Sequence, residues 1–222
     1  TVVPSSGSAG NLTGNTFRQG RWALTYDDGP NANHTSRILD NLTANGMKAS
    51  FFWLSSLTPN FPTLINRTKS LGMAMGNHSH SHANLPRQGA ASLQREIVAS
   101  TATHARMFGY RPTYFRCPYG ACGGNGSNIR QLIAAQGMVH IFWNVDSLDW
   151  QDKNPASIVT RVTRAMAVAK KGVLLFHDIH PQTVEATRLL MSSWAPQVRT
   201  GAMRLLTIPQ AIDELNSDAG MQ

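Results

Sequence analysis

The sequence predicts a distorted (β/α) barrel with about seven strands. Short apolar runs alternate with helical patterns along most of the chain, which is typical of βα units that build a parallel sheet or barrel. The length of 222 residues is that of a single α/β barrel. An open, doubly wound sheet is the competing fold, but no Gly-rich nucleotide-binding turn follows any apolar run. The alternation and the length therefore favour the barrel.

The predicted strands are the apolar runs, and in chain order they are Trp22–Tyr26, Lys48–Leu54, Met73–Gly76, Pro112–Arg116, Met138–Asn144, Gly172–Phe176 and Met203–Leu206. The predicted helices alternate with them and are Thr35–Ala44, Pro62–Leu71, Gly89–Phe108, Ser127–Gln136, Pro155–Ala169, Thr183–Ala195 and Ile208–Leu215. Helix-start residues support two of these helices. Asn154 precedes a proline in the first turn, and Ser127 or Asn128 can cap the helix after the Gly-rich loop. Seven units in strict alternation indicate a barrel one unit short of eight.

The chain divides into an N-terminal arm and one domain. Residues 1–20 are rich in Ser, Gly, Thr and Asn, so we expect them to form a flexible arm, and residues 21–222 to form the domain. No apolar run reaches the roughly 18 residues of a membrane span. The chain does not begin with a charged segment followed by an apolar one, so we expect any signal peptide to have been removed.

The charge of the chain is strongly basic. Lys and Arg number 20 against 12 Asp and Glu, which leaves a net charge of +8. A basic protein is attracted to polyanions such as nucleic acid, anionic lipid or an acidic cell-wall polymer. The basic residues are scattered and do not interleave with aromatic ones, so we expect no nucleic-acid partner.

Two cysteines, Cys117 and Cys122, enclose the sequence Pro-Tyr-Gly-Ala. A structural zinc site is not expected because no second cysteine pair or companion histidine stands at zinc-finger spacing. The two residues either form a small disulfide that holds a loop, which would imply an oxidising compartment, or remain as two thiols.

Five polar clusters follow predicted strands at their C-terminal ends, and they are Asp27–Asp28, Asn77–His82, Arg116–Gly120, Asp146–Trp150 and His177–His180. In a barrel this is the face on which active sites are built. Loops without function would fall on either face, and no such cluster falls on the other one. The placement therefore predicts one active site that draws residues from five loops.

Asp28, His78 and His82 have the composition of a catalytic metal site. Two imidazoles four residues apart can bind one metal ion, and a carboxylate completes a set that leaves coordination positions open. Zinc is the default ion, and other first-row divalent ions are compatible. The alternative is that Asp27-Asp28-Gly29-Pro30 is an exposed turn and that the histidines are ordinary surface residues.

The remaining cluster residues suit acid–base chemistry. Asp27 can take a proton from water, and Arg116 can pair with it and keep it ionised. His177 can act as a general acid, with Asp149 keeping it protonated near neutral pH. Trp150 can line a sugar or acyl pocket. A glycosidase is disfavoured because its two carboxylates must face each other across about 5–9 Å. A serine hydrolase is disfavoured because no Gly-x-Ser-x-Gly sequence occurs.

These motifs resemble those of the polysaccharide deacetylase family, also called carbohydrate esterase family 4 or the NodB-like domain. Thr-Tyr-Asp-Asp-Gly-Pro is similar to the first family motif, which implies that Asp27 is the base and Asp28 a metal ligand. His-Ser-His-Ser-His is similar to the second, which implies that His78 and His82 are the other ligands. The resemblance runs from about Trp22 to Leu215.

The other three motifs follow in family order. Arg-Cys-Pro-Tyr resembles the third, which implies that Arg116 orients the base and that the backbone N–H of Tyr119 holds the oxyanion and lies against the substrate. Asp-Ser-Leu-Asp-Trp resembles the fourth, which implies that Asp149 tunes the acid and that Trp150 lines the acetyl pocket. Leu-Phe-His resembles the fifth, with His177 as the acid. Two features depart from the family pattern: the cysteine after the arginine, and the Gly-Gly-Asn-Gly loop after the second cysteine.

The resemblance implies that the domain removes N-acetyl groups from a polymer that contains N-acetylglucosamine. The basic charge favours peptidoglycan, and the protein is then expected to be secreted, periplasmic or associated with the cell wall. Chitin or its oligosaccharides are the first alternative substrate, and O-acetyl xylan is the second. A catalytically silent wall-binding relative is a further alternative, although the acid, the base and the ligands are all present.

Overall fold

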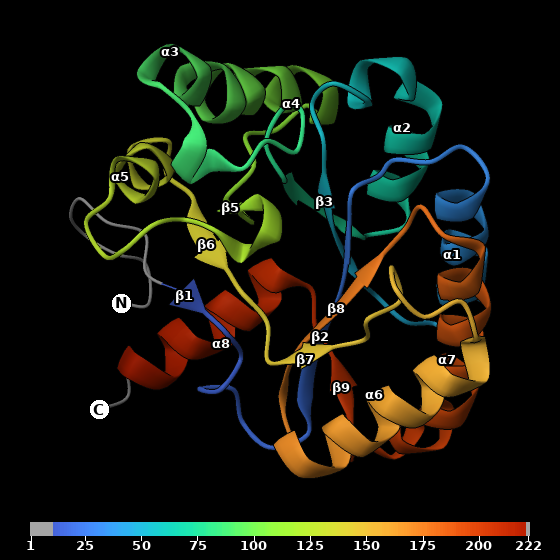
Figure 1. Ribbon diagram of the computed structural model, residues 1–222. Helices are drawn as coiled ribbons and strands as arrows, with labels where there is room; N and C mark the ends of the chain where they lie inside the picture. Colours follow the sequence, from blue (N-terminus) through green and yellow to red (C-terminus); the bar gives the residue numbers. More distant parts are fainter. Residues whose placement is uncertain (1–10, 221–222) are drawn as a thin grey trace.

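The computed structural model describes residues 11–220, and these residues form one curled sheet with helices around it (Figure 1). The strands pair in parallel in the order β1-β6-β5-β4-β3-β2-β8-β7, and β9 pairs with β2. Their bounds are β1 Asn11–Leu12, β2 Arg21–Asp27, β3 Ser50–Trp53, β4 Ala74–Asn77, β5 Tyr114–Phe115, β6 Val139–Ile141, β7 Val145–Asp146, β8 Gly172–His177 and β9 Arg204–Leu205. Within residues 11–220, β1 and β7 end the order and do not pair with each other. The sheet is therefore a curled half-barrel, as a distorted barrel predicts.

The helices are α1 His34–Ala44, α2 Pro62–Ser70, α3 Ala90–Leu93, α4 Ser100–Phe108, α5 Asn128–Ala135, α6 Pro155–Ala169, α7 Pro181–Thr200 and α8 Ile208–Gly220. Short 3₁₀ turns are Thr58–Asn60, Leu85–Arg87 and Pro118–Gly120. A π-helical segment, Gln94–Ala99, joins α3 to α4. The predicted caps are confirmed, since Asn154 accepts hydrogen bonds from the N–H groups of Ala156 and Ser157, and Ser127 from that of Arg130.

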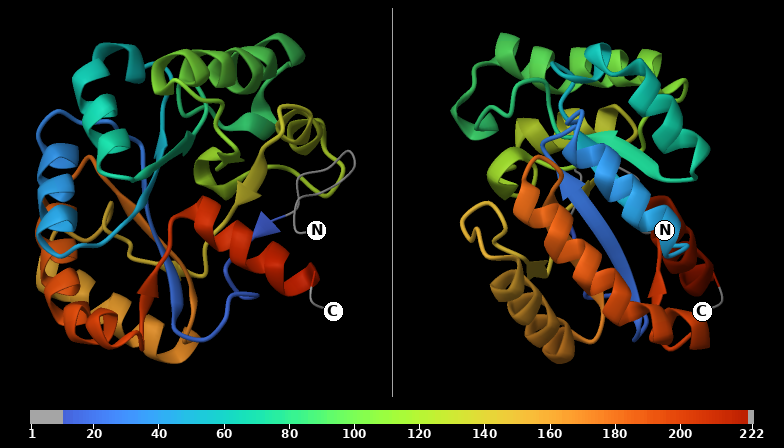
Figure 2. Two further views of the ribbon diagram at one scale, coloured as in Figure 1. Left: turned by 180° about the vertical axis from the view of Figure 1, so that it is seen from behind. Right: turned by 90° about the vertical axis from the view of Figure 1, so that its right-hand side faces the viewer.

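Alternation along the strands divides the core into two parts. Trp22, Leu24 and Tyr26 belong to the cluster that packs against helices outside the sheet, and Figure 2 shows α1 and α7 lying together against this side. Ala23 belongs to a second cluster with inward-facing residues of other strands and with Ile208 of α8. Successive side chains of a strand point to opposite faces, so a run that is apolar at every position is buried on both sides.

The N-terminal boundary of the domain lies earlier than predicted. Residues 1–10 of the predicted arm lie outside the described residues. Residues 11–20 do not form a flexible arm: Asn11 and Leu12 pair with β6, and Phe17 is buried. The segment is mostly polar, and only two apolar side chains, Leu12 and Phe17, anchor it to the domain. The predicted boundary at residue 21 was therefore wrong.

The C-terminal ends of the strands converge on one edge. Asp27 at the end of β2 is in register with His177 at the end of β8, and Asn77 of β4 is in register with Phe115 of β5. The register brings the predicted polar clusters to a single face.

Among residues 11–220, no helix is both long and apolar enough to cross a lipid bilayer.

Candidate active site

Asp27 and Asp28 stand where β2 ends, and the turn there points both carboxylates at one histidine. Asp28 has a positive φ of 78°, so the chain leaves the strand geometry directly after Asp27. Oδ2 of Asp27 lies 3.6 Å from Nε2 of His78, and Oδ1 of Asp28 lies 3.2 Å from the same nitrogen. The two neighbouring acids can therefore act at one centre.

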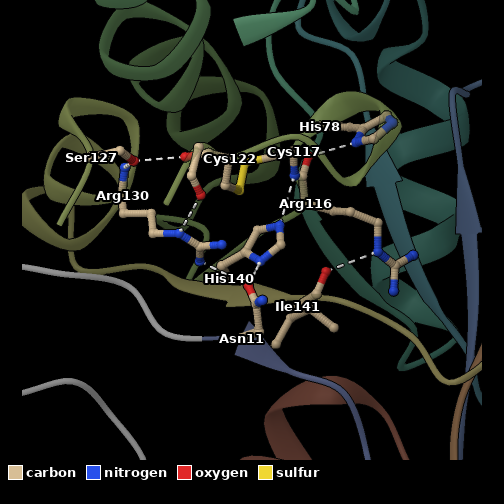
Figure 3. The surroundings of a disulfide bond; sticks show 10 residues. Asn11, His78, Arg116, Cys117, Cys122, Ser127, Arg130, His140 and Ile141 are labelled. Carbon is tan, nitrogen blue, oxygen red and sulfur yellow. Dashed lines mark hydrogen bonds between the residues drawn. A yellow bond between two sulfur atoms is a disulfide. The ribbon is translucent and has the colours of Figure 1, made fainter. Parts of the chain in front are cut away.

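Asp28, His78 and His82 form a donor set that fits a divalent metal ion. Their ligand atoms lie within 4.8 Å of one another, and Nε2 of His82 is 3.2 Å from Oδ1 of Asp28. That buried Oδ1 has no hydrogen-bond partner, as expected of an oxygen reserved for a ligand. The Nδ1 of His78 donates to the carbonyl oxygen of Arg116 at 2.7 Å (Figure 3). In the neutral ring, Nε2 then carries the lone pair that can bind a metal ion.

Electrostatics favour a cation between these residues. Burial acts to raise the pKa of Asp28, but the contacts and charges of His78 and His82 hold it well below its ordinary value. Burial acts to lower the pKa of His78, and the charges of Asp27 and Asp28 overcome this and raise it. Either a proton or a metal ion can satisfy these acids, so metal binding and protonation compete at this site.

Asp27 is held by a buried arginine. Nη1 of Arg116 donates to Oδ1 of Asp27 at 2.7 Å and to Oγ1 of Thr25 at 2.9 Å. The other guanidinium nitrogens donate to the carbonyl oxygens of Ile141 and Phe142. Burial lowers the pKa of Arg116, yet a guanidinium keeps its charge in proteins. Because Oδ1 of Asp27 is occupied, Oδ2 is the oxygen that faces the donor set.

His177 is paired with a fully buried carboxylate. Its Nδ1 donates to Oδ1 of Asp149 at 2.6 Å, and Oδ2 of Asp149 accepts from the His177 N–H at 2.8 Å and from Thr183 Oγ1 at 2.5 Å. Burial acts to lower the pKa of His177, but the hydrogen bond and charge of Asp149 raise it to about 9. The ring is therefore protonated at neutral pH, and Nε2 carries the proton that is free to move.

Two aromatic residues predicted for the site are exposed. Tyr119 is 68% exposed, and its ring meets the ring of His82 edge-on at 4.7 Å. The backbone N–H of Tyr119 donates no hydrogen bond within residues 11–220, so it is available to an oxyanion. Trp150 is 54% exposed in the turn that follows Asp149. The structure thus places Tyr119 against His82, whereas Trp150 is placed only by its position directly after Asp149.

Sequence reasoning missed Asp178 as a supporting residue. Its carboxylate accepts from the Gly29 N–H at 3.1 Å, Trp53 Nε1 at 3.0 Å and Thr35 Oγ1 at 2.5 Å. A Cβ on Gly29 would lie 2.3 Å from this carboxylate, which explains the glycine. Burial raises the pKa of Asp178 to about 7. Its position beside His177 was a signal, but its partners come from segments far away in the sequence.

Glu96 was also missed, and it supports the loop between His78 and His82. Its buried carboxylate accepts from the N–H of His80 at 3.0 Å, the N–H of Ser81 at 2.8 Å and Ser81 Oγ at 2.6 Å. These contacts lower the pKa of Glu96 against the opposing effect of burial. Glu96 stands in the π-helical segment, a distortion frequent at functional sites, and no local pattern in the sequence announces it.

We expect Glu96→Ala to weaken metal binding about 10–100-fold, the usual effect of losing an outer-shell contact. Glu96→Gln should restore most of the affinity, because its amide oxygen can still accept from both backbone N–H groups. A competition titration of zinc against a chromogenic chelator measures both. Glu185→Ala is the matched control, since Glu185 is an exposed acid on α7 that pairs with Arg188. Equal affinity in Glu96→Ala and the control would contradict the role.

Comparisons with known proteins agree with this arrangement. The chain is 28% identical over 193 residues to a peptidoglycan-N-acetylglucosamine deacetylase of Bacillus cereus, an alignment that covers 87% of this chain and 68% of that protein. It is 37% identical over 164 residues to the peptidoglycan-N-acetylglucosamine deacetylase PgdA of Listeria monocytogenes, covering 73% of this chain but only 33% of that protein. The chain thus spans about a third of the length of the Listeria relative.

A solved structure of the peptidoglycan deacetylase PdaC from Bacillus subtilis superposes with a TM-score of 0.78 at 31% identity, covering 92% of this chain and 95% of that one. Residues 14–141 match the sequence model of the family described as polysaccharide deacetylase. This match begins before residue 21, in agreement with the packing of residues 11–20 against the domain. It includes Asp27, the donor set and Arg116. Because it covers more than half of the chain, the chain belongs to the polysaccharide deacetylase family.

Proposed function

We propose that this protein is a metal-dependent deacetylase that hydrolyses the N-acetyl groups of N-acetylglucosamine residues in peptidoglycan. The observation that carries the proposal is the placement of a metal donor set beside a base held by Arg116 and an acid held by Asp149. The names of the relatives support peptidoglycan as the polymer. The net charge of +8 favours an anionic wall polymer over neutral chitin.

Asp28, His78 and His82 would hold the ion, for which we propose zinc. Two imidazoles and one carboxylate suit zinc and leave coordination positions open for water and substrate. Such an ion supplies a Lewis acid that polarises the acetyl carbonyl and lowers the pKa of water. Zinc, manganese and cobalt added separately to metal-free protein, each followed by an activity measurement, identify the preferred ion.

The protein's own residues carry the proton transfers. Oδ2 of Asp27 takes a proton from the water whose oxygen attacks the acetyl carbon, while Arg116 keeps Oδ1 in place. The unpaired N–H of Tyr119 donates to the oxygen that becomes negatively charged. Nε2 of His177 then gives its proton to the amide nitrogen as the carbon–nitrogen bond breaks. The products are acetate and the free amine of glucosamine.

We also propose that the protein works outside the cytoplasm, at the cell wall. The described residues contain a disulfide between Cys117 and Cys122, and disulfides persist in oxidising compartments. A polymer of the wall is found in the same place. Fractionation of cells that produce the protein, with detection by antibody, tests the location.

Acetate release from peptidoglycan, chitooligosaccharides and acetylated xylan, measured side by side, tests the substrate. We expect release from peptidoglycan, and mass spectrometry of a defined fragment should find one acetyl group fewer on a glucosamine residue. Release from chitooligosaccharides or xylan without release from peptidoglycan would overturn the proposed polymer. Failure to release acetate from any of the three, with metal bound, would overturn the deacetylase activity itself.

The pH dependence of the reaction should reflect the acid. His177 must be protonated to donate, and its pKa is raised to about 9, so we expect kcat to fall as the pH rises through about 9. In Asp149→Asn the pKa of His177 should drop toward its ordinary value of about 6.5, which moves the alkaline limb to lower pH. Asp152→Asn, in the same loop but paired with Arg161 and not with His177, is the control. An alkaline limb that stays in place in Asp149→Asn would show that His177 is not the acid.

A further inference from the structure

The loop that carries Tyr119 is closed by a disulfide. Cys117 and Cys122 are bonded to each other, and both are buried (Figure 3). Between them a tight turn forms, in which the Gly120 N–H donates to the Cys117 carbonyl at 2.9 Å and the Ala121 N–H to the Pro118 carbonyl at 3.0 Å. The cysteine at position 117 is one of the two departures from the family pattern. Its partner lies only five residues away, so the bond acts on this turn alone.

The turn needs an external restraint because of its backbone. Tyr119 and Gly120 both have positive φ, 61° and 66°, and a bulky residue is rarely found in this region. The side chain of Tyr119 is mostly exposed, so core packing does not fix it. If φ of Tyr119 returned to negative values, the peptide plane between Pro118 and Tyr119 would rotate and carry the Tyr119 N–H away from its present direction. The direction of that N–H therefore depends on how the ends of the turn are held.

A buried histidine holds the first end. The Cys117 N–H donates to Nε2 of His140 at 3.1 Å, and Nδ1 of His140 lies 2.8 Å from Oδ1 of Asn11. Because a backbone N–H can only donate, Nε2 must be the lone pair, and Nδ1 must carry the proton that Asn11 accepts. Arg130 donates to the same Asn11 oxygen at 2.8 Å. Burial, with Arg130 next, holds the pKa of His140 well below its ordinary range, so the ring stays neutral.

A steric contact limits the turn on its inner side. A Cβ placed on Gly120 would lie 2.5 Å from the ring of Phe142 and 3.1 Å from that of Trp143, so the backbone of the turn rests directly on the two residues that follow β6. Phe142 also offers its carbonyl to Arg116. The turn therefore lies between Phe142, whose carbonyl oxygen accepts from Arg116, and the ring of His82, which the Tyr119 ring contacts.

We propose that the Cys117–Cys122 disulfide, His140 and Asn11 form a clamp that positions the Tyr119 N–H, so that the protein reaches full activity only when the disulfide is formed. This Tyr119 clamp rests on the proposed function, since the N–H matters only if an oxyanion develops beside it. The four residues do not touch substrate. They are positioning residues that act through the backbone of Tyr119.

Two independent ways of opening the disulfide test the clamp. One is reduction of the wild-type protein by a water-soluble phosphine, which is oxidised to its oxide while the disulfide becomes two thiols. The other is the double variant Cys117→Ala/Cys122→Ala. Each should lower kcat about tenfold or more, short of the ~10²–10³-fold cost of removing an oxyanion donor outright. KM and zinc affinity should stay unchanged.

A tetrahedral phosphonate analogue of the acetyl group separates the clamp from general loosening. Its affinity should fall by the same factor as kcat, because both depend on the oxyanion donor. The double variant also controls for the phosphine, since it has no disulfide to reduce and should not respond. Unchanged kcat and unchanged analogue affinity after the disulfide is opened would overturn the proposal.

Asn11 offers a test far from the reacting atoms. Asn11→Ala removes the acceptor for Nδ1–H of His140 and should lower kcat with KM unchanged. Asn11→Asp keeps an acceptor oxygen and should restore kcat. If Asn11→Asp were as slow as Asn11→Ala, the hydrogen bond to His140 would not be the cause.

Amide hydrogen exchange tests the clamp without any substrate. In the metal-loaded wild type we expect the Cys117 and Gly120 amides to be protected, and in the double variant to exchange faster, while amides of α6 are unaffected. Equal exchange in the two proteins would overturn the clamp. If the wild type released no acetate from any polymer but showed this protection pattern, the deacetylase function would fail and the clamp would stand.

Discussion

Asp27→Asn should lower kcat by about 10²–10⁴-fold, the usual contribution of a positioned general base, while the metal site remains loaded. The amide cannot take a proton from water, but it is nearly isosteric and can still accept from Arg116 at the position of Oδ1. Asp28, His78 and His82 form the donor set, and Asp27 is not one of its members. Acetate release, with metal content measured on the same samples, checks both parts.

The variant also changes the stability of the fold, because a buried arginine loses its counter-charge. Removing one partner of a buried ion pair costs about 3–5 kcal/mol, and retention of a hydrogen bond by Asn should place the loss at the lower end. Thermal unfolding determines the temperature at which activity must be compared. Asp40→Asn is the control, since Asp40 is an exposed acid on α1 paired with Arg67. Wild-type turnover in folded, metal-loaded Asp27→Asn would refute the mechanism.

His82→Ala should lose the metal ion, and with it the activity. His82 is one of three residues in the candidate donor set among residues 11–220, so we expect the loss of zinc affinity to exceed the ~10–100-fold typical of outer-shell changes. His82 is a better choice than His78, because the side chain of His82 is partly exposed whereas that of His78 is buried and bonded to the Arg116 carbonyl. Metal analysis after dialysis against a dilute chelator gives the occupancy.

His80→Ala provides a control from the same loop. His80 lies between the two ligands in sequence, but its Nδ1 contacts Ser55 Oγ at 2.9 Å and the residue is not part of the donor set. We expect this variant to retain its zinc. If His82→Ala and His80→Ala kept the metal equally well, the assignment of Asp28, His78 and His82 as the ligands would be wrong.

The clustering of the site residues was predictable because they lie at or after the C-terminal ends of strands, most of which the sequence marks as apolar runs. Leu24 and Leu174 belong to apolar runs whose burial is a local property of composition, and a parallel strand order places the ends of such runs on one face. The spacing of His78 and His82 and the adjacency of Asp27 and Asp28 are likewise readable in the sequence. The roles expected for His177 and Asp149 came from their acid–base chemistry, and the family resemblance implied the same roles, although both residues lie beyond those matched by the family model.

The supports of the site were not predictable in the same way. Strands β1 and β7 have two residues each, too few to produce a period, and β1 pairs with a strand far away in the sequence, β6. In the sequence nothing distinguishes Glu96 from other acids on a helix. In the structure it lies in the π-helical segment, and its carboxylate accepts from the N–H groups of His80 and Ser81. The sequence did not decide whether Cys117 and Cys122 form a disulfide or remain as two thiols.

By itself the sequence determined the barrel class and the face on which the polar clusters lie, and it predicted the acid, the base and the donor set, because these depend on apolar patterning and on residue types at short spacing. Only the tertiary structure decided which oxygen of Asp27 is free, which nitrogen of His78 can bind a metal, and how Tyr119 is held. The physical reason is that hydrogen bonds and ion pairs are directional and act over about 3 Å. Their partners here are joined by folding across as many as 149 positions of the chain.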